Sequence, residues 1–140
     1  MSLELSTRTL GDWLEHWAEV TPDKEYIVYS DRNLRFTWGK FNERVDNMAK
    51  GLLSIGVEKG THVGIWAGNV PDWLTFLYAC AKIGAVAVTV NTNYKQAELE
   101  YLCQNSDMHT SCIVNGDRGS DDFVNMVYTM PPELKTCQRG

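Results

Sequence analysis

The stretch of the chain that decides the fold is residues 62–90, HVGIWAGNVPDWLTFLYACAKIGAVAVTV. Its first five residues are mostly apolar and predict a strand over 62–66. Pro71 suits the first turn of a helix, and Gly84 is placed to end that helix. Residues 85–90 are small, β-branched and almost wholly apolar, which is typical of a parallel strand covered on both faces. The stretch therefore predicts a β-α-β unit.

The same alternation continues toward the C-terminus. The sequence predicts a helix over about 95–105, a strand over 110–114 and a helix near 121–128, and residues 134–137 look like the start of a further strand. Short connections in the order β-α-β-α-β-α indicate a parallel sheet with right-handed crossovers. In the helix that begins at Pro71 we expect a buried stripe formed by Trp73, Phe76, Leu77, Cys80 and Ile83.

Toward the N-terminus the pattern changes to a helix, a hairpin and a second helix. Residues 9–20 predict a helix whose buried stripe is Leu10, Trp13, Leu14 and Trp17. Residues 26–29 and 34–37 predict two strands joined by a short turn, which is a hairpin. A helix capped by Thr37 then buries Phe41, Val45, Met48, Ala49 and Leu52 and ends before Gly56. The fold class is therefore α/β: a partial parallel sheet with flanking helices and an N-terminal β-hairpin.

Composition restricts the class of protein. Of the 140 residues, 44% are hydrophobic and 22% are charged, which excludes a disordered or collagen-like chain. The net charge of −5 argues against a nucleic-acid partner, because such proteins carry a basic face. No apolar stretch is long enough for a transmembrane segment, and the first residues do not resemble a secretory signal.

The cysteines indicate a compartment. They lie inside apolar segments and lack the two-residue spacing of metal-binding pairs. We expect buried free thiols at Cys80, Cys103, Cys112 and Cys137. Free thiols in turn predict a cytoplasmic location for the protein.

Two groups of residues could carry chemistry, and each has a simpler interpretation. The segment 64–69 joins a strand to a helix, where phosphates often bind, but it matches neither the dinucleotide nor the Walker pattern. A tight turn explains it better. His16, His62 and His109 lie far apart and show no metal spacing, which predicts surface histidines and, for His62, a place at the core boundary. No Gly-x-Ser-x-Gly elbow accompanies them.

Acidic and aromatic side chains also favour structural roles. Asp117, Asp121 and Asp122 lack the ligand spacing of a calcium loop, and the last two suit the first turn of a helix. Packing explains three tryptophans on helix stripes better than base stacking does: Trp13, Trp17 and Trp73. The roles of Trp38 and Trp66 stay open. We therefore nominate no catalytic, cofactor-binding or metal-binding residue.

Six segments, in their order along the chain, resemble one known family. They are FTWGKF at 36–41, GLLSIGV at 51–57, EKGTHVGI at 58–65, NVPDW at 69–73, KIGAVAVTVN at 82–91 and AELEYL at 97–102. Together they resemble the N-terminal portion of the adenylate-forming enzymes, which include acyl-CoA synthetases, peptide-synthetase adenylation domains and luciferases. The segment VNTNY at 90–94 is most similar to the fatty acyl-CoA synthetase branch.

The resemblance implies a two-step ligase. A carboxylate attacks ATP to give an acyl-adenylate and pyrophosphate, and the thiol of CoA then displaces AMP. It therefore implies ATP, Mg²⁺ and CoA as cofactors and a fatty acid or another carboxylate as substrate. The family's phosphate loop, its acidic motif, its ribose-binding Asp and its C-terminal Lys are not among these 140 residues. Residues 1–140 would then be the N-terminal portion of the large AMP-binding domain, truncated before a second domain, with the remainder of the parent enzyme as partner.

Three functional hypotheses follow. The first is an N-terminal scaffold segment of an ATP-dependent fatty acyl-CoA synthetase that is inactive alone. The second is a standalone α/β ligand-binding or regulatory module that uses the turn at Gly68 and Asn69. The third is association as a homodimer through apolar surface that the chain leaves uncovered.

Overall fold

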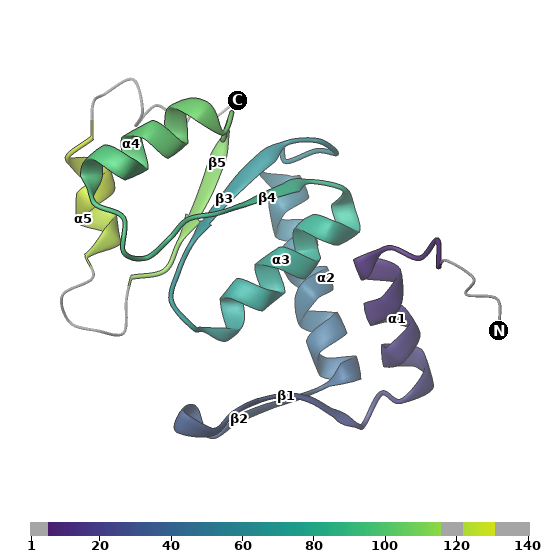
Figure 1. Ribbon diagram of the computed structural model, residues 1–140. Helices are drawn as coiled ribbons and strands as arrows, with labels where there is room; N and C mark the ends of the chain where they lie inside the picture. Colours follow the sequence, from purple (N-terminus) through teal and green to yellow (C-terminus); the bar gives the residue numbers. More distant parts are fainter. Residues whose placement is uncertain (1–5, 116–121, 131–140) are drawn as a thin grey trace, which may run out of the picture.

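A computed structural model describes residues 6–115 and 122–130 (Figure 1). The expected strand at 134–137 and most of the loop at 115–120 lie outside the described residues. In chain order the elements are α1 (Leu10–Val20), β1 (Glu25–Tyr29), the short 3-10 helix η1 (Ser30–Arg32), β2 (Leu34–Thr37), α2 (Trp38–Ser54), β3 (His62–Trp66), α3 (Pro71–Ile83), β4 (Val86–Thr89), α4 (Gln96–Asn105), β5 (Thr110–Ile113) and α5 (Phe123–Tyr128).

The centre of the fold is a three-stranded parallel sheet in the order β4-β3-β5. His62 pairs with Val86 on one side of β3, and Val63 pairs with Thr110 on the other. The crossover from β3 to β4 and the crossover from β4 to β5 run in opposite directions across the sheet, so α3 and α4 lie on opposite faces (Figure 1). The predicted parallel α/β sheet is confirmed.

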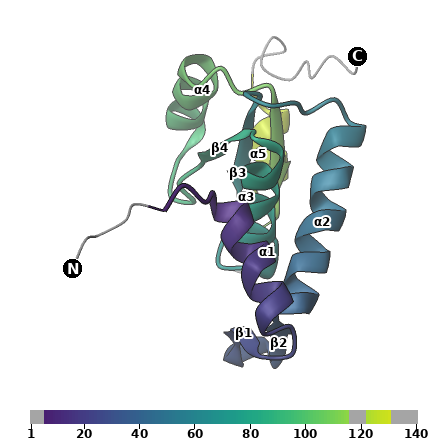
Figure 2. The same cartoon turned by 90° about the vertical axis from the view of Figure 1, so that its right-hand side faces the viewer.

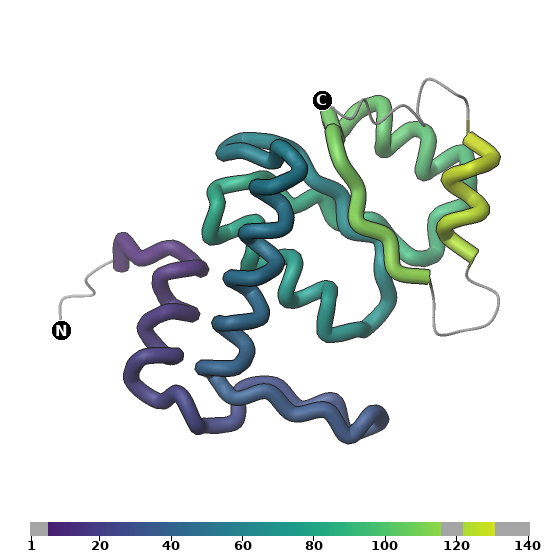
Figure 3. Tube along the Cα trace, turned by 180° about the vertical axis from the view of Figure 1, so that it is seen from behind, coloured from purple at the N-terminus to yellow at the C-terminus, as the bar shows by residue number. Residues whose placement is uncertain are grey.

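Each face of the sheet has its own apolar cluster. Val63 and Ile65 of β3 pack with α1, α2 and α3 in the larger cluster, whereas Trp66 packs with α4 and α5 in the smaller one. This alternation follows from the two-residue period of a strand. Figure 3 shows α4 and α5 together on the side of the sheet away from α2 and α3, and the hairpin of β1 and β2 near the beginning of α2.

The helices begin and end where the sequence predicts. Thr9 and Asp12 form a reciprocal capping box on α1, and the Thr37 hydroxyl accepts a hydrogen bond from the Lys40 amide at the start of α2. Gly56 and Gly84 follow α2 and α3 with φ of +88° and +74°, a left-handed conformation that glycine adopts without strain. In the described ranges no helix has the length and apolarity needed to cross a membrane.

The hairpin is confirmed, and it explains Trp38. β1 and β2 are antiparallel, with a register irregularity between Glu25 and Ile27. The Tyr26 ring stacks on Trp38 with centroids 3.7 Å apart, and the Tyr26 hydroxyl lies 2.8 Å from that of Tyr78 in α3. Burial, together with this hydroxyl contact, raises the pKa of Tyr26 above its ordinary value. Trp38 therefore ties the hairpin to the helices.

The expectation that residues 85–90 are covered on both faces is only partly right, because Ala87 packs against the larger cluster and Val90 lies in the smaller one, yet the strand is not fully buried. The fully buried strand is β3, in which residues 63–66 are all buried, while β4 lies at the edge of the sheet with Val86 and Thr89 exposed. Composition indicates that a segment tolerates burial, but it does not report the position of a strand in the sheet.

The buried stripes of α1 and α3 also differ from expectation. In α1 the buried residues are Gly11 and Leu14, whereas Leu10, Trp13 and Trp17 are exposed. In α3 Phe76 and Cys80 are buried as predicted, but Trp73, Leu77 and Ile83 are only half-buried, and Pro71, Thr75 and Ala79 are buried instead. The reason is that α3 packs against both α1 and α2 as well as the sheet, so the residues it buries do not form one simple stripe (Figure 2).

Gly64 in the central strand tests how tightly the sheet is packed. A Cβ on Gly64 would lie 2.0 Å from the Met108 sulfur and 3.0 Å from the Ser111 hydroxyl. We predict that Gly64→Ala lowers the free energy of unfolding by about 1–3 kcal/mol in urea titrations, because overpacking a core costs that much. The loss should shrink in a Met108→Ala background, which removes the obstructing sulfur.

Gly51 in α2 provides the control for this substitution. Nothing lies within 4 Å of a Cβ built there. Gly51→Ala should therefore leave stability unchanged or raise it by up to about 1 kcal/mol, since alanine is the better helix former. Equal losses at Gly51 and Gly64 would contradict the packing explanation.

Candidate functional site

The carboxyl ends of the parallel strands are where an α/β fold of this kind places ligands. The chain leaves β3 for α3 on one face and leaves β5 for α5 on the other (Figure 1). Ligands of open α/β sheets bind at such a switch point between neighbouring strands. The turn from β3 into α3, which the sequence singled out at 64–69, lies at this position.

The residues of this turn pack into the apolar core. Ala67 and Val70 are buried in the larger cluster, and the Val70 amide donates to the Gly68 carbonyl across 2.9 Å. A shallow depression of about 360 Å³ beside the turn is lined by Tyr29, Gly68, Asn69, Val70, Trp73 and Leu74. None of these side chains is charged. The depression therefore offers no cation to a phosphate, which favours the interpretation of a tight turn.

Trp66 closes the other side of the strand end. Its ring is buried and stacks on Phe123 of α5, with centroids 4.3 Å apart and planes at 18°. The indole nitrogen has no hydrogen-bond partner among the described residues. Trp66 is thus a packing residue that fixes α5 on the sheet, and it is not available to stack on a ligand.

An arginine, an aspartate and a threonine join α2 to the start of α3. The Arg44 Nη2 atom lies 2.5 Å from the Asp72 carboxylate, and its Nε donates to the Thr75 hydroxyl at 3.0 Å. The Thr75 hydroxyl in turn donates to the Pro71 carbonyl, and the Arg44 guanidinium lies 5.7 Å from the Phe36 ring centroid. Both charges are neutralised by each other, so the cluster holds elements together and is not a catalytic acid or base.

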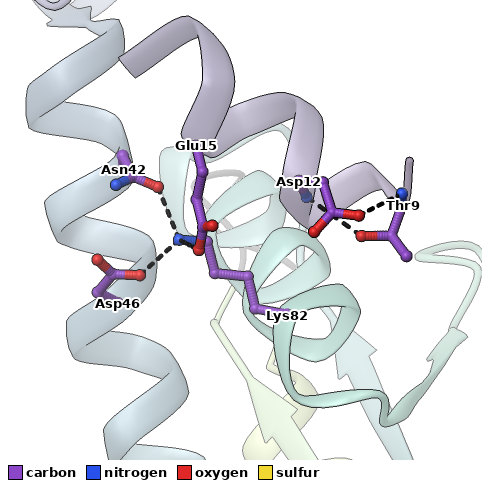
Figure 4. Close-up of polar contacts among 6 residues, drawn as sticks. All are labelled: Thr9, Asp12, Glu15, Asn42, Asp46 and Lys82. Atoms are coloured by element: carbon purple, nitrogen blue, oxygen red, sulfur yellow. Dashed lines mark hydrogen bonds and ion pairs between the residues drawn. The ribbon is translucent and has the colours of Figure 1, made fainter. Parts of the chain in front are cut away.

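Lys82 joins three helices at one point. Its ammonium lies 2.6 Å from Asp46 and 2.7 Å from Asn42 of α2, and 2.9 Å from Glu15 of α1 (Figure 4). The Lys82 side chain is only 10% exposed. Burial alone would lower its pKa, but the two carboxylates outweigh burial and raise the pKa above the ordinary value.

Gly11 makes this arrangement possible. A Cβ on Gly11 would lie 3.0 Å from the Cγ atom of Lys82, so the lysine stem passes close over α1. On the same helix the Thr9 amide donates to Asp12 and the Asp12 amide donates back to the Thr9 hydroxyl, as Figure 4 shows. The hydrogen bond from the Thr9 amide is the main cause that lowers the Asp12 pKa.

The structure does not bring the histidines together. His16 lies between the rings of Trp13 and Trp17, while His62 Nδ1 donates to the Ser106 carbonyl at the other end of the sheet. His109 is exposed beside Thr110. Among the described residues there is no group of three or more potential metal ligands.

The remaining candidate residues are structural or lie outside the described part. The Asp122 carboxylate caps α5 by accepting from the Asn125 amide, as predicted, whereas Asp117 and Asp121 fall outside the described residues. Cys80 is a buried free thiol, but Cys103 and Cys112 are only half-buried, and Cys137 is outside the described residues. The expectation of buried thiols is therefore right for Cys80 and wrong in degree for the other two.

Sequence reasoning missed the two polar clusters. Neither Arg44 nor Lys82 stands in a sequence pattern that predicts its partners. Ion pairs between α2 and α3 join residues 28 and 36 positions apart, and no short-range spacing reveals such pairs. The available signal was a lysine in the last turn of an otherwise apolar helix.

The fold is of the α/β class, and the Arg44 and Lys82 clusters join its helices. Residues 14–133 match the AMP-binding enzyme family, and the chain belongs to that family. The chain is 44% identical over 137 residues to YngI from Bacillus subtilis, an inferred acyl-CoA synthetase. It is 33% identical over 140 residues to the mitochondrial medium-chain acyl-CoA ligase ACSF2 from Bos taurus.

The matched region is nearly all of this chain but only a small part of each relative. They include 98% and 100% of this chain but only 25% and 23% of those relatives, so the chain spans about a quarter of their length. Among solved structures, the N-terminal domain of FACL13 from Mycobacterium tuberculosis has a TM-score of 0.80 at 24% identity, covering 91% of this chain and 32% of that one. That likeness shows the shared fold, and the family match over residues 14–133 confirms the resemblance drawn from the six sequence segments.

The Lys82 cluster yields a stability prediction. Lys82→Met keeps the apolar stem but leaves Glu15 and Asp46 without their cation. We predict a loss of about 1–3 kcal/mol in the free energy of unfolding at pH 7, measured in urea, since losing one partner leaves a partly buried polar group unsatisfied. The two carboxylates are themselves about half-exposed, which keeps the loss below that of a fully buried pair.

Lys40 in α2 is the matched control. It is exposed, and the described residues provide it with no ion-pair partner. Lys40→Met should change stability by less than about 0.5 kcal/mol. A loss at Lys82 no larger than that at Lys40 would show that the cluster does not hold the three helices.

Cys80 yields a pH prediction. Burial raises the pKa of its thiol from 9.0 to about 11. Between these values the unfolded chain releases the proton while the folded chain keeps it, so rising pH favours unfolding. We predict that the free energy of unfolding falls from about pH 8.5 to pH 10, and that the fall is less steep in Cys80→Ala.

The half-buried Cys103 serves as the comparison. Burial also raises its pKa, so Cys103→Ala should reduce the alkaline slope as well, but by less than Cys80→Ala does. The Lys82 contribution is constant in this window, because a raised lysine pKa costs stability only above its ordinary value of 10.5. Equal slopes in wild type and Cys80→Ala would refute the assignment.

Proposed function

We propose that this chain acts as the N-terminal scaffold of an ATP-dependent fatty acyl-CoA synthetase and has no activity alone. The observation that carries the proposal is the 44% identity over 137 residues to an inferred acyl-CoA synthetase, together with the family match over residues 14–133. The parent reaction would form an acyl-adenylate and pyrophosphate from a fatty acid and ATP, and then an acyl-CoA and AMP.

Two features of the described residues support the scaffold role. The side chains that line the depression beside the β3–α3 turn are uncharged, and two cations at α3, Arg44 and Lys82, already pair with carboxylates. Phosphate binding needs cations or unpaired amides, and adenylation needs charge neutralisation at the leaving pyrophosphate. We therefore assign the catalytic residues to the remainder of the parent enzyme and none to the described residues of this chain.

The sheet and α4 offer surfaces for that part. β4 and β5 are the outer strands among the described residues, and a mostly apolar hollow of about 400 Å³ on α4 is lined by Tyr94, Ala97, Glu98, Tyr101 and Leu102. An edge strand presents unpaired backbone groups, and an exposed apolar hollow favours a covering partner. We propose that the remainder of the parent enzyme covers both.

A proposed cytoplasmic location goes with this role. It rests on the free thiols of Cys80, Cys103 and Cys112. The ACSF2 relatives are named as mitochondrial proteins, so fractionation of cells that express the natural gene is the deciding measurement.

The function is tested by adding ATP, Mg²⁺, CoA and fatty acids of several lengths to the purified chain. We expect no pyrophosphate release and no saturable ATP binding in calorimetry. Turnover by the chain alone would overturn the claim of inactivity, and tight ATP binding would favour a standalone ligand-binding module. The reading frame downstream of Gly140 gives a second test: the proposal requires a Gly-rich Thr/Ser loop there, and its absence would defeat the ligase assignment.

A further inference from the structure

One face of α1 carries large apolar side chains that stay partly exposed, although Trp17 also contacts Trp38 with ring centroids 6.1 Å apart. Four of them recur at three- and four-residue intervals, which places them in one row along the helix. We call this row the outer stripe; its members and their exposed fractions are Leu10 at 45%, Trp13 at 39%, Trp17 at 40% and Val20 at 57%.

The outer stripe is remote from the surfaces assigned above to the rest of the parent enzyme. α1 packs on α2 and α3 through its buried residues Gly11 and Leu14 and forms the layer farthest from the sheet, whereas the hollow on α4 lies beyond the other face of the sheet (Figure 1). A contiguous apolar row that is exposed on a helix marks an interaction surface. Two features of the stripe indicate which partner fits it.

The order of the side chains fits a second copy of the same helix. Leu10 and Val20 lie equally far from residue 15, and so do Trp13 and Trp17. In an antiparallel pair with a two-fold axis near residue 15, Leu10 therefore meets the partner's Val20, and Trp13 meets the partner's Trp17. An isologous interface requires such self-complementarity, and packed helices lie about 8–10 Å apart, which brings side chains of this size into contact.

Charge at the two ends of α1 fits the same arrangement. Arg8 precedes the helix and Asp23 follows it, both are exposed, and their midpoint falls next to residue 15. The Arg8 guanidinium already lies over the Trp13 ring, 4.9 Å from its centroid, so it is positioned at one end of the stripe. In the antiparallel pair Arg8 approaches the partner's Asp23, and the two helix dipoles oppose each other favourably.

We propose that two copies of this chain associate through the outer stripe of α1 as an antiparallel two-fold pair. Four side chains from each copy cover less than the roughly 800 Å² per partner of a standard interface. The dimer should therefore be weak, with a dissociation constant between about 10 µM and 1 mM. The association needs no substrate or nucleotide, so its test is independent of the proposed ligase function.

Sedimentation velocity of the chain from about 5 µM to 1 mM tests the proposal. We expect a monomer–dimer equilibrium that is weakened at least about tenfold by Val20→Asp, because a carboxylate would be buried against the partner's Leu10. Circular dichroism of each variant confirms folding. A chain that stays monomeric to 1 mM overturns the proposal.

Two comparisons identify the geometry. Arg8→Glu should weaken the dimer, and Arg8→Glu with Asp23→Arg should restore it, because the reversed charges meet again only in the antiparallel pair. Ile55→Asp and Val86→Asp, at exposed apolar positions on other elements, should leave the dissociation constant unchanged. If Val86→Asp abolishes association while Val20→Asp does not, the copies pair through the edge of the sheet and the proposal is wrong.

Discussion

The ammonium of Lys82 is the contact on which the arrangement of the helices depends. One cation with little access to solvent satisfies acceptors from α1 and α2 at once, and it reaches them from the last turn of α3. Gly11 lets the lysine stem pass, so a position without a side chain and a position with a long one are coupled. These contacts fix α1, α2 and α3 relative to each other. Removing this single charge disturbs all three contacts, because Lys82 makes each of them.

A second constraint is the central place of β3. Both of its neighbours pair with it and not with each other, and each of its faces contributes to a separate apolar cluster. Gly64 is tolerated in this strand because Met108 fills the space that a side chain would take. The helices held by Lys82 cover only one face. The other face depends on Trp66 and Phe123, whose stacked rings bring α5 onto the sheet.

Local signals predicted the elements well, and the reasons are visible in particular residues. Thr9, Thr37, Gly56 and Gly84 mark helix boundaries through hydrogen bonds or dihedral angles that depend only on near neighbours. Burial was predicted less well. Trp13 and Trp17 share an apolar arc with Leu14, and sequence alone does not decide which part of a broad arc meets α2 and α3. The pairs of Arg44 with Asp72 and of Lys82 with Asp46 join distant segments, so only the fold reveals them.

The same polar pairs explain why this part of the chain need not contain catalytic residues. Arg44 lies at the start of α3, where a phosphate would be held, yet it is bound to Asp72 and to the buried Thr75. If a phosphate displaced Asp72 from the Arg44 guanidinium, the Asp72 carboxylate would lie beside that phosphate without its ion-pair partner. Two neighbouring negative charges repel each other, so this exchange would make phosphate binding less favourable. A segment whose charges already hold its helices together therefore agrees with the proposed role of a scaffold for an active site that other residues build.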